Sequence, residues 1–298
     1  MYKIGIDVGG TNLAAGITNH AGELIHKDSA KVKQGATSEV VLQDMYNLVT
    51  KMLQETNITE DKIQYIGIGV PGACDYYTGL VIFTPNLNLS GVNLRTEFAK
   101  HTSIPVYVDN DANCAALGEK IQGAAKNYNG SVTITLGTGV GVGVVINNML
   151  INGIVEAGHI TIDPNGPVCG CGNKGCLESY ASATALINAA KQHDPTIKEA
   201  KEIFDAVGSP NNPWASELIK DYIFYLGVGI NSLINSYPIQ AVILGGGISK
   251  QGDALIQPLK KVLQERAFNS GNTVDILQAT LGNDAGIIGA AELASRET

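Results

Sequence analysis

Short apolar runs, separated by glycine and polar turns, fill the N-terminal part of the chain. Residues 2–8, 12–19 and 24–32 each have the composition of a β-strand, and the segments GGT and NHAGE between them favour tight turns. Residues 63–72 form a further apolar run that ends in a Pro-Gly turn. The pattern therefore predicts a β-meander followed by a buried strand.

A helical spacing of apolar residues occupies positions 37–55. Its apolar side chains share one broad stripe, made by Val40, Val41, Met45, Leu48, Val49, Met52 and Leu53. Strands and an amphipathic helix in this order favour a mixed sheet that is covered by helices.

The second half of the chain repeats this theme. A strand that ends in a glycine- and hydroxyl-rich turn occurs at residues 4–12 and again at 132–143, which suggests two similar halves facing a cleft. The predicted elements are two strands within 131–148, helices over 181–192, 214–235 and 252–267, a loop at 209–213 and a strand over 240–246.

Composition narrows the class of protein. The chain has 298 residues, 44% of them hydrophobic, which is enough for two domains or one large α/β unit. Its net charge of -8 argues against a nucleic-acid surface, because binding to phosphates requires clustered Lys and Arg. Five cysteines, an odd number, fit a reducing compartment better than a set of disulfides.

Residues 131–155 carry no charge and raise the alternative of a transmembrane segment. Their glycines and asparagines disfavour it, as does the strand-like alternation at Val132, Ile134 and Leu136. The first ten residues lack the basic and apolar pattern of a signal peptide. We therefore expect a cytoplasmic protein without a membrane partner.

The densest chemistry lies in residues 156–178, EAGHITIDPNGPVCGCGNKGCLE. One imidazole and three thiols, from His159, Cys169, Cys171 and Cys176, form the ligand set of a closed structural zinc site. The intervening glycines allow the chain to turn back so that these side chains converge. Because all four ligands are protein groups, we expect Zn2+ to hold the shape of the loop and not to activate water.

Three glycine-rich turns could bind phosphate through backbone N–H groups: DVGGTN at 7–12, LGTGVG at 136–141 and LGGGIS at 244–249. Asp7, in the first of them, could face a metal ion. Taken singly, a glycine turn is more often simply a turn, and the chain has neither a Walker A sequence nor a GxGxxG with a spaced acid. A nucleotide would therefore need a different phosphate-binding architecture.

Taken together and in this order, the motifs carry a family resemblance. The turns above, with DNDAN at 109–113 and the EAGH and CGCGNKGCLE segments, resemble the ROK family of sugar kinases within the actin, hexokinase and Hsp70 superfamily. The resemblance implies an α/β fold of two ribonuclease-H-like domains around a central cleft. We expect a small domain over residues 1–117, completed by a C-terminal helix at about 285–298, and a larger domain over 118–284 that carries the zinc loop.

The resemblance also implies the ligands, with ATP and Mg2+ in the cleft and the sugar deeper within it. The family's zinc ligands fall on the histidine and the three cysteines named above. The nucleotide-binding residues that it implies are Asp7, Gly9, Gly10, Thr11, Asn12, Thr138, Gly139, Gly245, Gly246 and Gly247.

Transfer of the γ-phosphoryl group of ATP to a sugar hydroxyl requires a base. Asp111 is the candidate, because it lies between the strand-like residues 104–110 and the helix-like residues 112–121 and would project from a strand end into a cleft. The alternative is that Asp109 or Asp111 merely caps the helix.

Polar side chains that surround a sugar discriminate best where solvent is excluded. By the resemblance, the candidate sugar ligands are Asn110, Asp111, Glu156, His159 and Glu178, with Gly72 and Asn86 as weaker ones. His159 could serve twice, because one ring nitrogen can bind zinc while the other donates to a hydroxyl. For Glu156 the alternative is a solvated loop acid.

The segment CGCGNKGCLESYAS is most similar to the glucokinase branch, so glucose is the first candidate substrate and glucose 6-phosphate the product. N-acetylmannosamine, N-acetylglucosamine, fructose and allose stay open, since NGIVEAGH at 152–159 is shorter than the family's usual approach to the histidine. A sugar sensor without catalysis is the alternative from another class. Family repressors carry a helix-turn-helix domain ahead of the first phosphate loop, which here begins at residue 7; this favours a kinase, and by analogy a homodimer.

Overall fold

The computed structural model describes residues 1–151, 153–266, 268 and 274–297. The chain forms two compact units, of which the first consists of Met1–Asn127, Gly143–Val155 and Thr280–Thr298 and the second of Tyr128–Val142 and Glu156–Ala279. The domain boundaries expected from the sequence, after residues 117 and 284, stay a prediction.

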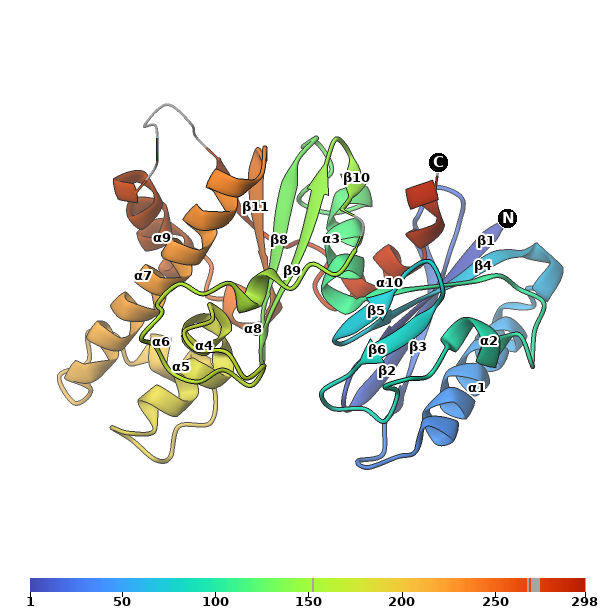
Figure 1. Cartoon of the computed structure of the whole chain (residues 1–298), viewed down its shortest axis with the longest axis horizontal. Helices are drawn as coiled ribbons and strands as arrows, with labels where there is room; N and C mark the ends of the chain where they lie inside the picture. The colour runs from blue at the N-terminus through green and yellow to red at the C-terminus, as the bar shows by residue number, and fades with distance from the viewer. Residues whose placement is uncertain (152, 267, 269–273, 298) are drawn as a thin grey trace. The chain divides into compact units, whose positions relative to one another are not determined.

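A five-stranded mixed sheet forms the centre of the first unit (Figure 1). Its order is β3-β2-β1-β4-β7, in which β1 (Tyr2–Val8), β2 (Asn12–Thr18) and β3 (Leu24–Lys31) form an antiparallel meander, whereas β4 (Ile63–Val70) and β7 (Val106–Asn110) run parallel to β1. The meander and the mixed sheet predicted from the sequence are confirmed.

The period-two alternation of β1 sends its side chains to two different faces of this sheet. Ile4, Ile6 and Val8 are buried in a core that they share with the apolar stripe of α1 (Ser38–Thr56). Gly5 and Asp7 face the other side, where α10 (Asp284–Ala290) packs. One strand thus supplies both the hydrophobic core and a carboxylate on the opposite face.

Three glycines let α10 approach this face closely. Gly16, Gly5 and Gly67 are register partners on the neighbouring strands β2, β1 and β4. A Cβ at Gly5 would lie 1.9 Å from the carbonyl oxygen of Ile287, and one at Gly67 would lie 1.7 Å from that of Ala290. Because no side chain fits there, the three positions form a flat track beneath the helix.

The helix α3 (Asp111–Ile121) packs against α10 in the same way. A Cβ at Gly289 would lie 1.7 Å from the carbonyl oxygen of Cys114. In addition, the buried carboxylate of Glu119 accepts hydrogen bonds from the backbone N–H groups of Thr280 (3.1 Å) and Leu281 (2.9 Å). The segment before α10 is therefore tied to α3, and the N-terminus of α3 has a fixed support.

Smaller elements complete the first unit. They are η1 (Glu60–Lys62), the two-stranded sheet of β5 (Ala73–Asp75) and β6 (Leu80–Phe83), α2 (Leu94–Phe98) and η3 (Leu293–Glu297).

The second sheet also has five strands, in the order β10-β9-β8-β11-β12. In it, β11 (Ala241–Gly245) pairs in parallel with β8 (Ser131–Leu136) and with β12 (Asp275–Gln278). The strand β9 (Val140–Ile146) begins among the residues of the second unit and continues, with β10 (Met149–Leu150), among those of the first. Two five-stranded sheets with helices confirm the predicted mixed α/β class.

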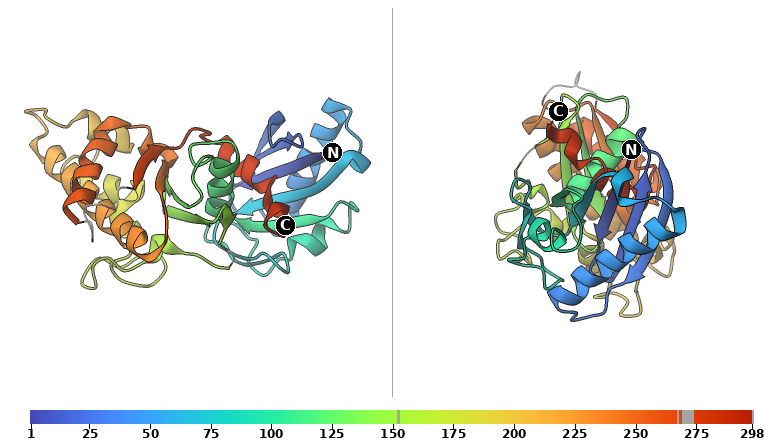
Figure 2. Two further views of the ribbon diagram at one scale, coloured as in Figure 1. Left: turned by 90° about the horizontal axis from the view of Figure 1, so that it is seen from above. Right: turned by 90° about the vertical axis from the view of Figure 1, so that its right-hand side faces the viewer.

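Helices make up most of the rest of the second unit. The long helices α7 (Pro213–Ser236) and α9 (Asp253–Arg266), orange in Figures 1 and 2, pack side by side, and a Cβ at Gly227 would lie 2.5 Å from a methyl carbon of Val262. The shorter ones are η2 (Ala157–His159), α4 (Glu178–Ala181), α5 (Ala183–Ala190), α6 (Ala200–Asp205) and α8 (Gly246–Ser249).

The helix predicted over 181–192 corresponds to α5, which is shorter by two residues at each end. It begins after Ser182, which has extended backbone angles and caps α5, because its side chain accepts a hydrogen bond from the Ala185 N–H (3.0 Å). The predicted loop at 209–213 ends in Pro213, which begins α7 at a position that favours proline. The helix predicted over 252–267 corresponds to α9, and residue 267 lies outside the described residues.

The uncharged stretch 131–155 contains β8, β9 and β10. Among the described residues, none of the helices combines the length and the apolar character that a membrane span would need.

The glycine contacts generate a stability prediction. Gly289→Ala should lower the free energy of unfolding by about 2 kcal/mol or more, because its Cβ forces α10 away from α3. Urea denaturation measures the change. The control is Gly10→Ala, whose Cβ would lie 3.4 Å from the nearest atom outside its own segment. Equal losses of stability in the two variants would show that the close helix contact does not matter.

Candidate active site and metal centre

Asp7 lies at the end of β1, on the face that α10 covers. A Cβ at Gly286 would lie 2.8 Å from the Asp7 Cγ, so the carboxyl group rests against the first turn of α10. Burial raises the pKa of Asp7 to about 6. The following turn is closed by the Gly9 N–H, which donates to the Asn12 carbonyl (2.8 Å). A carboxylate that has lost hydration in this way suits a divalent cation, whose charge compensates for the loss.

Asp111 is the first residue of α3, immediately after the carboxyl end of β7. The N-cap of α3 is Asn110, whose Oδ1 accepts from the N–H groups of Ala112 (2.8 Å) and Asn113 (3.2 Å). Asp109 is buried and accepts from the side-chain amide of Asn113 (2.9 Å). The N-cap is therefore Asn110 and neither aspartate, although the Asp111 Oδ1 also accepts from the Ala112 N–H (2.8 Å). The role of Asp111 as a base stays a prediction.

The register of the sheet brings Asp7 near the start of α3. Gly69 on β4 is the register partner of Asp7 on β1 and of Asp109 on β7. The backbones of Asp7 and Asp109 are therefore two strand spacings, about 10 Å, apart. A Cβ at Gly69 would lie 3.0 Å from the Sγ of Cys114 and 3.6 Å from the Cα of Asp111. Burial, with the charges of Asp7 and Asp111, raises the pKa of the Cys114 thiol well above its usual value. The two carboxylates therefore lie on neighbouring parts of one sheet edge.

Gly72 connects this edge to the next loop. Its carbonyl accepts from the Asn110 side-chain amide (2.8 Å), and its φ of 92° favours glycine. A Cβ there would lie 2.3 Å from the Phe83 carbonyl oxygen and 3.3 Å from the Cδ of Pro85. Gly72 is thus needed to hold Asn110 beside the loop that contains Asn86.

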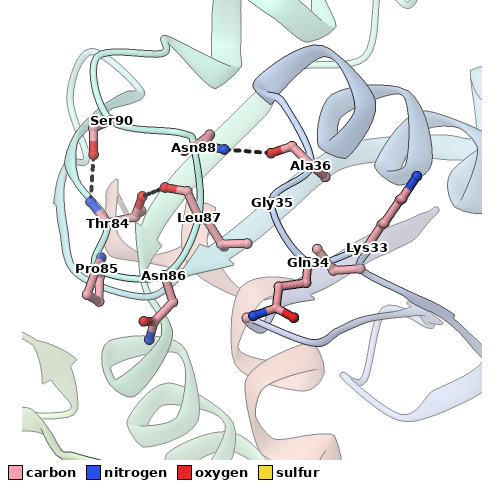
Figure 3. A pocket seen from close by; sticks show the side chains of 12 residues that line it. Lys33, Gln34, Gly35, Ala36, Thr84, Pro85, Asn86, Leu87, Asn88 and Ser90 are labelled. Carbon is pink, nitrogen blue, oxygen red and sulfur yellow. Dashed lines mark hydrogen bonds between the residues drawn. The ribbon is translucent and has the colours of Figure 1, made fainter.

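A pocket of about 520 Å³ opens next to this loop (Figure 3). It includes Gly10 and Asn86, and a Cβ at Gly10 would lie 3.4 Å from the Asn86 Cβ. The other residues around it, which the sequence did not single out, are Val32, Lys33, Gln34, Gly35, Ala36, Thr84, Pro85, Leu87, Asn88 and Ser90. The only sequence signal in residues 32–36 is the glycine Gly35 after two polar residues, which is common in any surface loop.

In the second unit, His159 and the three cysteines converge. Their ligand atoms all lie within 4.8 Å of one another. The Cys169 Sγ is 3.5 Å from the His159 Nδ1, and the Cys171 and Cys176 Sγ atoms are 3.6 Å apart. The sequence therefore predicted the membership of this cluster correctly.

The distances in the cluster fit Zn2+. With Zn–S bonds near 2.3 Å and Zn–N bonds near 2.0 Å, a tetrahedron places two sulfurs about 3.8 Å apart and a sulfur and a nitrogen about 3.5 Å apart. Both values are close to those in the cluster. Because Nδ1 is the nitrogen that faces Cys169, Nε2 is left for a hydrogen bond elsewhere.

Glu178, the first residue of α4, joins the cysteine loop to the glycine turn at 136–141. Its Oε2 accepts from the Val140 N–H (3.0 Å), and its Oε1 is 3.7 Å from the Cys169 Sγ. A Cβ at Gly139 would lie 2.3 Å from Oε2, so this position requires glycine. The conformation of the turn and the placement of Glu178 therefore depend on each other.

Glu156 lies three residues before the histidine of the cluster. It is exposed as a residue, as a solvated loop acid would be, yet nearby protein atoms remove water from its carboxyl group. This desolvation raises the pKa of Glu156; His159 counteracts the rise and Glu178 adds to it. Glu156, His159 and Glu178 thus form one electrostatic group.

The third glycine turn follows β11. Gly246 has a φ of 80°, and a Cβ there would lie 2.4 Å from the Leu136 carbonyl oxygen. This close contact places the turn at 244–249 beside the turn at 136–141, which contains Thr138. Two of the three predicted phosphate-binding turns are therefore neighbours in the second unit.

The structure brings the predicted residues together in two sets. In the first unit these are Asp7, the turn at 9–12, Gly72, Asn86, Asn110 and Asp111. In the second unit they are the cysteine and histidine cluster, Glu156, Glu178 and the turns with Thr138, Gly139, Gly245, Gly246 and Gly247.

A model of the ROK family matches residues 3–297. A glucokinase from Halalkalibacterium halodurans is 33% identical, over 99% of this chain and 96% of that protein. A solved ROK family glucokinase from Streptomyces griseus, in complex with glucose and AMPPNP, is 31% identical with a TM-score of 0.82, over 98% of this chain and 99% of that one. These similarities confirm the hexokinase-type α/β fold.

A transcription factor is among the relatives as well. The xylose repressor of Bacillus spizizenii is 32% identical, over 98% of this chain and 76% of the repressor. The same fold is therefore found in kinases and in a regulator.

The cluster geometry predicts bound zinc. Elemental analysis should find about one zinc per chain, and Cys171→Ser should lose most of it while circular dichroism shows a largely folded protein, because a large domain has a core of its own. Cys74→Ala, which changes a cysteine of β5 that is not in the cluster, is the control and should keep its zinc. A parent protein that is purified with zinc present and binds none would contradict the assignment.

The raised pKa of Asp7 predicts a pH-dependent stability difference. Because the folded-state pKa, about 6, lies above the ordinary value of 3.8, the charged form destabilises the fold as pH rises from about 4 to 6. Asp7→Asn should therefore be more stable than the parent at pH 7.5, by about 1 to 3 kcal/mol, and equally stable near pH 4. Thermal unfolding across this range measures the difference, and a variant that is less stable than the parent at pH 7.5 would contradict it.

Proposed function

The chain belongs to the ROK family, and on this basis we propose that it transfers the γ-phosphoryl group of ATP to a hydroxyl of a hexose, with glucose as the first candidate and glucose 6-phosphate as the product. The observation that carries the proposal is the edge of the first sheet. There, Asp7 lies near the end of β1 and Asp111 directly follows β7, with β4 between the two strands. Asn110, the residue before Asp111, donates to the Gly72 carbonyl, and Gly72 lies against Pro85, the neighbour of Asn86.

Asp111 acts as the general base in this proposal. It follows Asn110, the N-cap of α3, and α3, which begins with Asp111, packs closely against α10. Rigid support of this kind keeps a carboxylate oriented toward the hydroxyl whose proton it accepts. The reactive hydroxyl then attacks the γ-phosphorus, and the leaving group is ADP.

Asp7 binds the divalent cation in this proposal. Its desolvated carboxyl and the N–H groups of residues 9–12 would hold Mg2+ and phosphate, and the cation when bound neutralises charge on the phosphates. In the second unit, the turns with Thr138, Gly139 and Gly245 to Gly247 supply further backbone donors.

The hexose is held by amide and carboxylate groups. Asn110 keeps one amide hydrogen beyond the bond to Gly72, and it can donate this hydrogen to a ring hydroxyl. Glu156, Glu178 and the free ring nitrogen of His159 offer further partners, and structural Zn2+ fixes their loop. The names of the relatives support glucose, and they leave the N-acetylated hexoses, fructose and allose to be tested.

A sugar-responsive regulator is the second candidate. The similarity to the xylose repressor supports it, because that protein shares the fold over nearly all of this chain. A regulator of this kind would bind sugar and release no ADP, so turnover distinguishes the two. A homodimer stays a prediction.

The base assignment predicts a selective loss of rate. Asp111→Asn should lower kcat with Mg-ATP and glucose by ~10²-fold or more, with a smaller change in KM for glucose, because the hydroxyl proton loses its acceptor. Asp61→Asn, an exposed acid in η1, is the control and should retain the parent rate. An Asp111→Asn enzyme that keeps more than half of the parent kcat would rule out the base.

A further inference from the structure

The pocket of the first unit has two walls that belong to different loops. Residues 32–36, between β3 and α1, form one wall, and residues 84–90, after β6, form the other. The Asn88 side-chain amide donates to the Ala36 carbonyl (2.8 Å) and joins the walls (Figure 3). The pocket therefore has a defined shape before any ligand enters.

Most polar groups of the second wall are already engaged. The Ser90 hydroxyl accepts from the Thr84 N–H (3.0 Å), and the Thr84 hydroxyl donates to the Leu87 carbonyl (2.6 Å). In the described part of the chain, by contrast, the side-chain amides of Gln34 and Asn86 make no hydrogen bond to protein. Each amide therefore has donors and an acceptor available to a ligand.

The Gln34 side chain points in a different direction from that of its neighbour Lys33. Figure 3 shows the Gln34 and Asn86 side chains extending to the same side of the pocket from its two walls, whereas Lys33 extends away from it. An amide presents a donor and an acceptor together, as a sugar hydroxyl does, while an ammonium group only donates. The pair of amides is thus chemically matched to a polyol.

We propose that Gln34 is a specificity-determining residue, whose side-chain amide hydrogen-bonds a hydroxyl of the acceptor sugar opposite Asn86. The proposal rests on the hexose kinase function proposed above and names a contact from a loop that carries none of the motif residues. A chain of contacts connects the pocket to the proposed base. The loop with Asn86 lies against Gly72 through Pro85, and Gly72 binds Asn110, the residue before the proposed base.

The test pairs a change in the protein with changes in the sugar. Gln34→Ala should raise KM for the preferred hexose by roughly 5- to 15-fold, as expected for one hydrogen bond to an uncharged group, with kcat within about twofold of the parent. Deoxy sugars that lack one hydroxyl at a time, other than the one phosphorylated, then locate the contact. For one of them, parent and Gln34→Ala should have equal KM values, because the partner hydroxyl is already missing.

Gln43→Ala is the matched control, since it removes the same side chain from an exposed position of α1 that does not line the pocket. It should leave KM unchanged for every sugar. The proposal would be overturned if Gln34→Ala had the same KM as the parent for every sugar. It would also be overturned if Gln34→Ala raised KM by the same factor for every deoxy sugar.

Failure of the proposed function gives a different result. If the parent phosphorylates no hexose, the kinase function fails, and calorimetry with the same sugars then tests the Gln34 contact as a change in Kd. If the parent neither phosphorylates nor binds any hexose, the contact is overturned as well.

Discussion

The close packing of α10 is the constraint on which the first unit depends. This helix lies on the glycine track of Gly16, Gly5 and Gly67, and its own Gly289 lies against the Cys114 backbone of α3, at distances that leave no room for a Cβ at these glycines. Backbone contacts this short hold α10 and α3 on one face of the sheet. The N-terminus of α3 and the end of β1 are then fixed relative to each other, and these two points carry Asp111 and Asp7.

The same packing has an energetic consequence for Asp7. Its carboxyl group rests against Gly286 and loses hydration, which raises its pKa toward neutrality. An apolar or amide side chain would have a smaller desolvation cost at this position. A carboxylate kept at such a cost is typical of functional sites, where a cation or substrate supplies the missing compensation.

Local sequence determined much of what could be predicted. The zinc cluster was recognisable because its four ligands lie within 18 residues and have distinctive chemistry, and β1, α1 and β8 were recognisable from strict periodicity. Features that depend on residues distant in the sequence, or on details of local hydrogen bonding, were not recognisable from the sequence. The Ser182 cap sets the start of α5, and Asn110, not an aspartate, is the N-cap of α3. The wall with Gln34 is a short loop segment without a helix or strand period. The role of each predicted site residue in catalysis is a question of chemistry that backbone pattern does not answer.

The central claim is that this chain phosphorylates a hexose at the expense of ATP. The most direct measurement incubates the purified chain with Mg-ATP and single hexoses, and follows ADP release together with the phosphorus NMR signal of the product. The account predicts sugar-dependent ADP release and one phosphate monoester on the sugar, with glucose among the substrates. Tight sugar binding without ADP release, in a zinc-loaded protein, would contradict catalysis and favour a sugar-responsive regulator.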